Sequence, residues 1–270
     1  MTSIKELREI TQKEKVEGRE RPWLYRSFER GPSIYITKIL LQTPVTPNQV
    51  SLLMILFGLV GSFFVYTGEL SNMIVGIAFL YGNILFDKVD GEIARFKKIF
   101  SLRGIYLDEI NHLVIPGLFF ASLTFALRGQ SVLSDDVFLT IGMLAALSMP
   151  FIRIGHSLAP QIFAKKFLKK RYLFTLPIAT EKTIVEGLKE RKGILVWFLQ
   201  TLHQFQEFFM ILLVVFFALI LQKYAEVSNL VVYALMGLGI LLPLIFIENT
   251  VKGFFQIEKR IADLDKRFKI

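Results

Sequence analysis

The sequence predicts an all-α fold: a six-transmembrane-helix bundle with an N-terminal amphipathic juxtamembrane helix. Of the 270 residues, 53% are hydrophobic and 26 are phenylalanine, a composition too apolar for an ordinary soluble domain. Six apolar windows are each long enough to cross a hydrocarbon core of about 30 Å. Basic residues gather in blocks at alternate ends of these windows, as they do in multi-pass membrane proteins.

Residues 1–45 are polar, charged and rich in helix-forming residues. Apolar side chains such as Trp23 and Phe28 alternate with basic ones such as Arg21 and Arg30, which predicts an amphipathic segment on the cytosolic face. A membrane anchor is its simplest role. The segment lacks the pattern of a cleaved signal peptide, and the chain has no cysteine for a disulfide or a thiolate metal site.

The membrane domain is predicted over residues 46–250. Thr46 is suited to cap the first helix and Pro47 to occupy its first position, where a missing N–H costs nothing. The remaining span boundaries follow from the lengths of the apolar runs. The six spans are expected at residues 50–68, 72–90, 105–127, 136–158, 205–222 and 229–247.

The net charge of +9 is unevenly distributed along the chain. Basic blocks lie in the N-terminal segment and at residues 95–103, 165–171, 189–192 and 259–269, whereas residues 67–72, 128–136 and 222–229 are neutral or nearly so. The positive-inside rule therefore places both termini and the basic connections in the cytosol.

Two charged segments outside the spans are assigned by composition. Residues 160–204 are expected to form a cytosolic or interfacial connection, with a surface helix favoured over a substrate lid. Residues 251–270 form a basic cytosolic tail. The basic blocks lie at span ends without an RNA or DNA motif, so we expect membrane lipids as partners and no nucleic acid.

Acidic residues cluster where the second and third spans meet the cytosol. Asp87 and Asp90 lie one helical turn apart, and Asp108 begins the next span. Three converging carboxylates repel one another unless a cation neutralises them, and such oxygen ligands select Mg²⁺, Mn²⁺ or Ca²⁺ over zinc. For Asp87 and Asp90 alone, the alternative is a span end paired with Lys88 or Arg95.

The acidic cluster is surrounded by residues suited to a phosphate-bearing ligand. A divalent ion commonly bridges carboxylates to substrate phosphate oxygens. Gly91 and Ala94 are small enough for a ligand to lie against the helix backbone, and Arg95 adds a fixed positive charge.

The stretch from Asp87 to Asn111 reads D-x2-D-G-x2-A-R-x8-G-x3-D-x3-N. It resembles the signature of the CDP-alcohol phosphatidyltransferase family, D-x2-D-G-x2-A-R-x8-G-x3-D-x3-D. The six spans, the amphipathic N-terminal segment and the Thr-Pro-Asn sequence at residues 46–48 extend the resemblance to about residue 160. The matching positions are Asp87, Asp90, Gly91, Ala94, Arg95, Gly104 and Asp108.

The resemblance implies transfer of a substituted phosphoryl group from a CDP-alcohol, often CDP-diacylglycerol, to a hydroxyl of a second polar alcohol. CMP is released, and the product belongs to phospholipid or polar-lipid synthesis. Asp87, Asp90 and Asp108 would then hold Mg²⁺ or Mn²⁺, with two ions expected. Members of the family often dimerise, which adds a homodimer as an expectation. The nucleotide side would be formed by Gly91, Ala94, Arg95 and Gly104.

Asn111 departs from the family signature, in which the fourth aspartate is the usual base for the attacking hydroxyl. An amide can coordinate metal through oxygen but cannot accept this proton. In one account His112, about 40° around the helix from Asp108, replaces the base, whereas Glu109 points about 100° away. His112 can equally be a structural histidine. In two further accounts the chain binds a CDP-alcohol without turnover, or Asn111 was engineered to trap a substrate complex.

The acceptor alcohol is not fixed by the sequence. Arg153 could bind an acceptor's phosphate, or it could pair with Glu207 or Glu248 inside the bundle. A rival from another class is a small transporter or scaffold with a structural cation. This rival is weaker because the acidic cluster lies at a membrane face and no pair of broken helices is evident.

Overall fold

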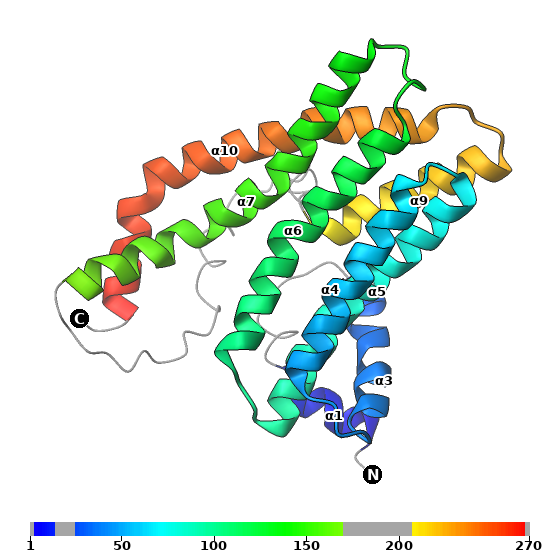
Figure 1. The fold of residues 1–270 in the computed structure, drawn as a ribbon. Coiled ribbons are helices and arrows are strands. Elements are labelled where there is room, and N and C mark those ends of the chain that lie inside the picture. Colours follow the sequence, from blue (N-terminus) through cyan, green and yellow to red (C-terminus); the bar gives the residue numbers. More distant parts are fainter. Residues whose placement is uncertain (1–2, 14–24, 170–206, 268–270) are drawn as a thin grey trace, which may run out of the picture.

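A computed structural model describes residues 3–13, 25–169 and 207–267 (Figure 1). These residues form helices and contain no strand, which confirms the all-α prediction. Most of the predicted connection at residues 160–204 lies outside the described residues, although its first part continues a long helix. The helices are α1 (Ile4–Thr11), η1 (Tyr25–Arg30), α3 (Gly31–Leu40), α4 (Pro47–Tyr66), α5 (Leu70–Lys97), α6 (Leu102–Ala126), α7 (Asp135–Lys169), α9 (Phe208–Tyr224) and α10 (Leu230–Arg267).

The long helices form a membrane bundle. Five of them, α4, α5, α6, α7 and α10, are long and apolar enough to cross a membrane, and α9 is a shorter apolar helix of 17 residues. Together they account for the six predicted spans. Helices α7 and α10 lie side by side and both extend past the length that a bilayer core requires (Figure 1).

The first long helix begins as its sequence predicts. Thr46 is the N-cap: its hydroxyl accepts a hydrogen bond from the Gln49 backbone N–H, and the Gln49 side chain accepts one from the Thr46 N–H. Pro47 takes the first helical position. This reciprocal capping satisfies two N–H groups that a helix start leaves without partners, and it fixes where α4 leaves the preceding segment.

Helices α4 and α5 approach each other at two glycines. A Cβ added to Gly76 would lie 2.7 Å from the carbonyl oxygen of Gly61, and a Cβ added to Gly61 would lie 2.8 Å from that of Gly76. Small residues at a crossing let helix backbones touch in a membrane bundle. This contact fixes α5, and with it the acidic motif, against α4.

Replacing Gly76 by alanine should therefore destabilise the bundle. The added methyl group meets backbone atoms that cannot move aside, and overpacking of this kind costs about 1–3 kcal/mol. We expect a lower thermal unfolding temperature in detergent. The control is Gly237→Ala in α10, where a Cβ meets nothing within 4 Å, so alanine should leave stability unchanged or raise it. Equal unfolding temperatures for the two variants would contradict the prediction.

The N-terminal amphipathic segment is built differently from the single surface helix that its sequence suggests. Its described residues form α1, η1 and α3, and all three of these helices pack against α5. Leu7 and Ile34 have no exposed surface, whereas Phe28 is exposed. Trp23 and Arg21 lie outside the described residues. The segment therefore buries some of its apolar side chains against the rest of the protein and leaves others exposed.

Candidate functional site

Asp87, Asp108 and His112 bring their side chains together between α5 and α6. One ligand atom from each lies within 4.8 Å of the others. His112 Nε2 is 3.4 Å from an oxygen of Asp87 and 3.4 Å from an oxygen of Asp108. Asp108 and His112 share a face of α6 because they are four residues apart, and Asp87 meets them from α5. Two carboxylates and an imidazole can hold a divalent cation, and the oxygen donors fit Mg²⁺ or Mn²⁺.

Asp90, the third predicted metal ligand, lies outside this group of three. Its carboxylate accepts a hydrogen bond of 2.6 Å from the hydroxyl of Ser51, which is buried on α4. The sequence did not single out Ser51. The bond shows that the motif is held from α4 as well as from α6, and a metal role for Asp90 stays a prediction.

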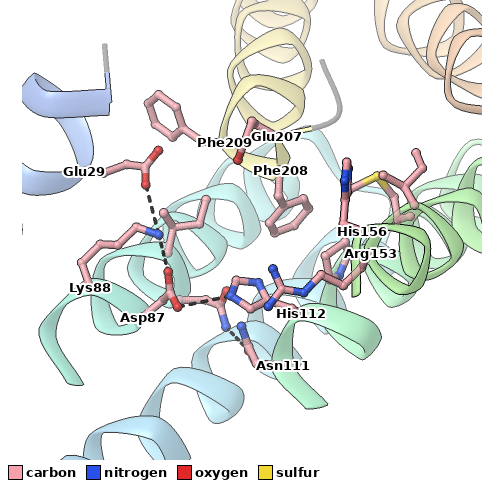
Figure 2. Close-up of a pocket in the computed structure, with 15 residues that line it drawn as sticks. Glu29, Asp87, Lys88, Asn111, His112, Arg153, His156, Glu207, Phe208 and Phe209 are labelled. Carbon is pink, nitrogen blue, oxygen red and sulfur yellow. Dashed lines mark hydrogen bonds and ion pairs between the residues drawn. The ribbon is translucent and has the colours of Figure 1, made fainter. Parts of the chain in front are cut away.

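Lys88 connects the acidic motif to the N-terminal segment. Its ammonium pairs with Asp87, a pairing that the sequence analysis gave as one alternative. The same ammonium lies 3.3 Å from a carboxylate oxygen of Glu29 in η1. Figure 2 shows Glu29, Lys88, Asp87 and His112 in a continuous row, joined by ion pairs and by the contact of Asp87 with the imidazole. Glu29 was missed by sequence reasoning because only the folded chain brings η1 to this place.

Asn111 is buried and held by a second asparagine. Its Oδ1 accepts a hydrogen bond of 2.6 Å from Nδ2 of Asn83, which also donates to the Met54 carbonyl at 2.8 Å. Both amides are buried. Sequence reasoning missed Asn83, although an asparagine in an apolar span, one helical turn before Asp87, was a usable signal.

The predicted nucleotide-side residues lie further along α5 and at the start of α6. A Cβ added to Gly91 would lie 3.2 Å from the guanidinium of Arg95, so this cation lies across the glycine. Gly91 and Ala94 are both half-buried. A Cβ added to Gly104 would lie 3.0 Å from Asn48 Oδ1, which indicates that Gly104 permits a close approach of α6 to the start of α4.

A cavity of about 180 Å³ adjoins the cluster of Asp87 and His112. It is bordered by five elements, η1, α5, α6, α7 and α9 (Figure 2). Arg153 and His156 line it from α7, and Glu207, the N-cap residue of α9, lines it from the start of that helix. The cavity therefore places cationic and acidic groups within reach of the same small polar ligand.

Arg153 pairs with Glu109, a partner that the sequence did not assign. Its Nη2 and Nε lie 3.0 and 3.3 Å from the two carboxylate oxygens of Glu109. The sequence suggested Glu207 or Glu248 as the partner of Arg153, and this prediction was wrong. Glu248 pairs with Lys252 on its own helix, and Glu207 lines the cavity. The physical reason is the contact of α6 with α7, which brings Glu109 to Arg153.

Comparison with known proteins agrees with the motif. A protein of Thermococcus kodakarensis described as "Bifunctional IPC transferase and DIPP synthase" is 28% identical over 144 residues, which cover 53% of this chain and 31% of that protein. The chain therefore matches about a third of the length of this relative. A sequence profile described as CDP-alcohol phosphatidyltransferase matches residues 44–241, which include the whole acidic motif and the cavity residues of α5, α6, α7 and α9. The chain belongs to the CDP-alcohol phosphatidyltransferase family.

Proposed function

We propose that this protein transfers a substituted phosphoryl group from a CDP-alcohol, with CDP-diacylglycerol as the expected donor, to a hydroxyl of a polar alcohol. CMP leaves, and the product is a phospholipid or a related polar lipid. The observation that carries the proposal is the convergence of Asp87, Asp108 and His112 beside a polar cavity in a helical membrane bundle. The description of the Thermococcus relative as a transferase and synthase supports it.

The residues take separate roles in this reaction. Asp87 and Asp108, with Asp90 nearby, would hold two divalent ions, Mg²⁺ or Mn²⁺, which neutralise phosphate charge when bound. Gly91, Ala94, Arg95 and Gly104 form the nucleotide side. Phosphoryl transfer depends mainly on positioning and on charge neutralisation, and both are supplied by residues fixed on α5 and α6.

His112 is the proposed acceptor of the proton from the attacking hydroxyl. It lines the cavity, and its Nε2 is oriented by Asp87 and Asp108. Asn111 cannot accept a proton, and its oxygen already accepts a hydrogen bond from Asn83. We therefore assign Asn111 to shaping the site and His112 to the proton transfer.

The active site is proposed to open to the cytosol. Basic blocks lie at the end of α5 and the start of α6, and at the ends of α7 and α10. The positive-inside rule places those ends together in the cytosol. The membrane domain then comprises residues 46–250, with the segment at 1–45 and the tail at 251–270 on the same side, and it can assemble as a homodimer.

The second candidate is a protein that binds a CDP-alcohol without turnover. Asn111 favours it, because the residue in the place of the usual base cannot take a proton. The two candidates share the donor and the metal and differ in CMP release. A transporter or scaffold with a structural cation accounts less well for the nucleotide-side motif.

The test of the proposed function is CMP release by the purified protein in detergent or liposomes. The mixture contains CDP-diacylglycerol, Mg²⁺ or Mn²⁺, and one of inositol phosphate, glycerol phosphate, serine or inositol. We expect CMP only with metal and with the accepted alcohol, and none after metal chelation. Binding of CDP-diacylglycerol without release of CMP in the presence of any of these acceptors would instead favour the second candidate.

Arg153 is proposed to bind the phosphate of a phosphorylated acceptor. A guanidinium that pairs with a carboxylate through two N–H groups can hold a phosphate in the same way. Arg153→Ala should raise the KM for such an acceptor by roughly tenfold or more and leave the KM for CDP-diacylglycerol unchanged. Glu109→Gln is the matched variant: it releases Arg153 from its carboxylate partner, so the KM for the acceptor should fall. Equal changes for both substrates would argue against the assignment.

A further inference from the structure

Glu92 lies within the acidic motif but belongs to none of its expected roles. Its side chain has no exposed surface, and four side chains donate hydrogen bonds to its carboxylate. Three of them reach Oε1: Gln12 at 2.9 Å, Arg30 at 3.1 Å and Ser33 at 2.7 Å. Thr37 donates to Oε2 at 2.7 Å.

All four donors come from the N-terminal segment, 55 to 80 residues earlier in the chain. Gln12 follows α1, Arg30 ends η1, and Ser33 and Thr37 belong to α3. A buried carboxylate is costly unless charge and hydrogen bonds compensate it, and buried donors are equally costly without an acceptor. Docking of the N-terminal segment and burial of Glu92 therefore require each other.

The same docking contact reaches Arg95. The Nε of Arg95 donates to the Thr11 carbonyl at 2.6 Å, and Thr11 is adjacent to Gln12 at the end of α1. Glu92 and Arg95 are three residues apart on α5, so they face the end of α1 together. A helix C-terminus also favours a cation through its exposed carbonyl groups. The end of α1 thereby holds the guanidinium that lies across Gly91.

The N-terminal segment touches the other end of the motif as well. Glu29 lies 3.3 Å from Lys88, which pairs with Asp87, and the Tyr81 hydroxyl donates to the Phe28 carbonyl. The segment thus borders the site at the predicted metal ligand Asp87 and at Arg95. Glu92 lies at the point where three parts of the segment meet.

We propose that Glu92 is a positioning residue: its carboxylate docks the N-terminal segment on α5 and so holds Arg95 in place for the nucleotide of the CDP-alcohol. This inference rests on the proposed function, in which Gly91 and Arg95 form the nucleotide side. Glu92 itself does not touch the donor. Its contribution should appear in donor binding and leave the chemical step, which depends on Asp87, Asp108 and His112, intact.

The kinetic test compares Glu92→Gln, Arg95→Ala and the double variant. We expect Glu92→Gln to raise the KM for the CDP-alcohol by roughly tenfold while kcat stays within about a factor of two. Because Glu92 acts through Arg95, the double variant should bind the donor no more weakly than Arg95→Ala alone. Glu69→Gln, an exposed change before the other end of α5, is the control and should leave both constants unchanged. Additive losses in the double variant, or an unchanged KM in Glu92→Gln, would overturn the proposal.

A labelling test measures the docking itself. The chain has no cysteine, so Leu7→Cys places a single thiol on α1 at a position without exposed surface. Its reaction with a water-soluble maleimide should be slow, and adding Glu92→Gln should speed it by roughly tenfold or more, as expected for local opening. An unchanged labelling rate would overturn the proposal. If Glu92→Gln does not fold, Gln12→Ala takes its place, because it removes one hydrogen-bond donor to Glu92. It should produce a smaller rise in the KM for the CDP-alcohol and a smaller increase in the labelling rate.

Failure of the proposed function and failure of this inference remain distinguishable. If the unmodified protein releases no CMP, the proposed reaction is refuted. The Kd of CDP with Mn²⁺ then replaces KM in the comparison of Glu92→Gln, Arg95→Ala and the double variant. The role of Glu92 is supported if Glu92→Gln weakens CDP binding and the double variant binds CDP no more weakly than Arg95→Ala alone. An unchanged Kd in Glu92→Gln refutes it.

Discussion

Replacing Asp108 by asparagine should lower metal-dependent CMP release by roughly a hundredfold to a thousandfold, the loss typical when a main electrostatic group of a site is removed. Asp108 meets Asp87 and His112 within 4.8 Å. Asparagine keeps the size of the side chain but removes the charge that would balance a divalent cation. The loss should therefore fall on metal binding and on turnover together.

The measurement combines CMP release with thermal unfolding at increasing Mn²⁺ concentration. Mn²⁺ should raise the unfolding temperature of the unmodified protein, because a ligand that binds only the folded state stabilises it. It should not do so for Asp108→Asn. The control is Asp135→Asn: this aspartate pairs with Arg128 beyond the end of α6 farther from the site, so turnover and metal response should persist. Full activity of Asp108→Asn would contradict the proposal that this cluster holds the metal required for CMP release.

The parts of the site that follow from local periodicity could be predicted from the sequence. The spacing of Asp87 on one helix, and of Asp108 and His112 on the next, placed them at adjoining helix ends, and the structure brings them together. Thr46 and Pro47 likewise marked the start of α4 through local chemistry. Such features need only the geometry of one helix or of two consecutive helices.

The remaining contacts depend on how distant segments fold back. Glu29 meets Lys88, and Gln12 meets Glu92, only because the N-terminal segment packs along α5. Arg153 meets Glu109 because α6 and α7 pack together. In a single sequence each of these residues is an ordinary charged or polar side chain in the N-terminal segment or near a span end, and the pattern contains no information on its partner. Tertiary packing, which local spacing does not specify, decided these pairs.

Replacing His112 by alanine should lower kcat by roughly a hundredfold to ten-thousandfold, the range for loss of a general base. If His112 mainly accepts the proton, the concentration of Mn²⁺ needed for half of the remaining activity should change little. A large rise in that concentration would instead make His112 a metal ligand, since its Nε2 lies 3.4 Å from both Asp87 and Asp108.

The Asn111→Asp substitution tests whether His112 acts as a base or as a metal ligand. The Nδ2 of Asn83 already donates to the oxygen at position 111, so an aspartate can accept the same hydrogen bond while adding a carboxylate that takes a proton. Combined with His112→Ala, Asn111→Asp should restore much of the lost kcat if the missing group is a base. If the double variant stays inactive, the loss arises from weakened metal binding. If the unmodified protein is inactive and Asn111→Asp alone releases CMP, the chain binds its CDP-alcohol without turnover, and the amide at position 111 is the cause.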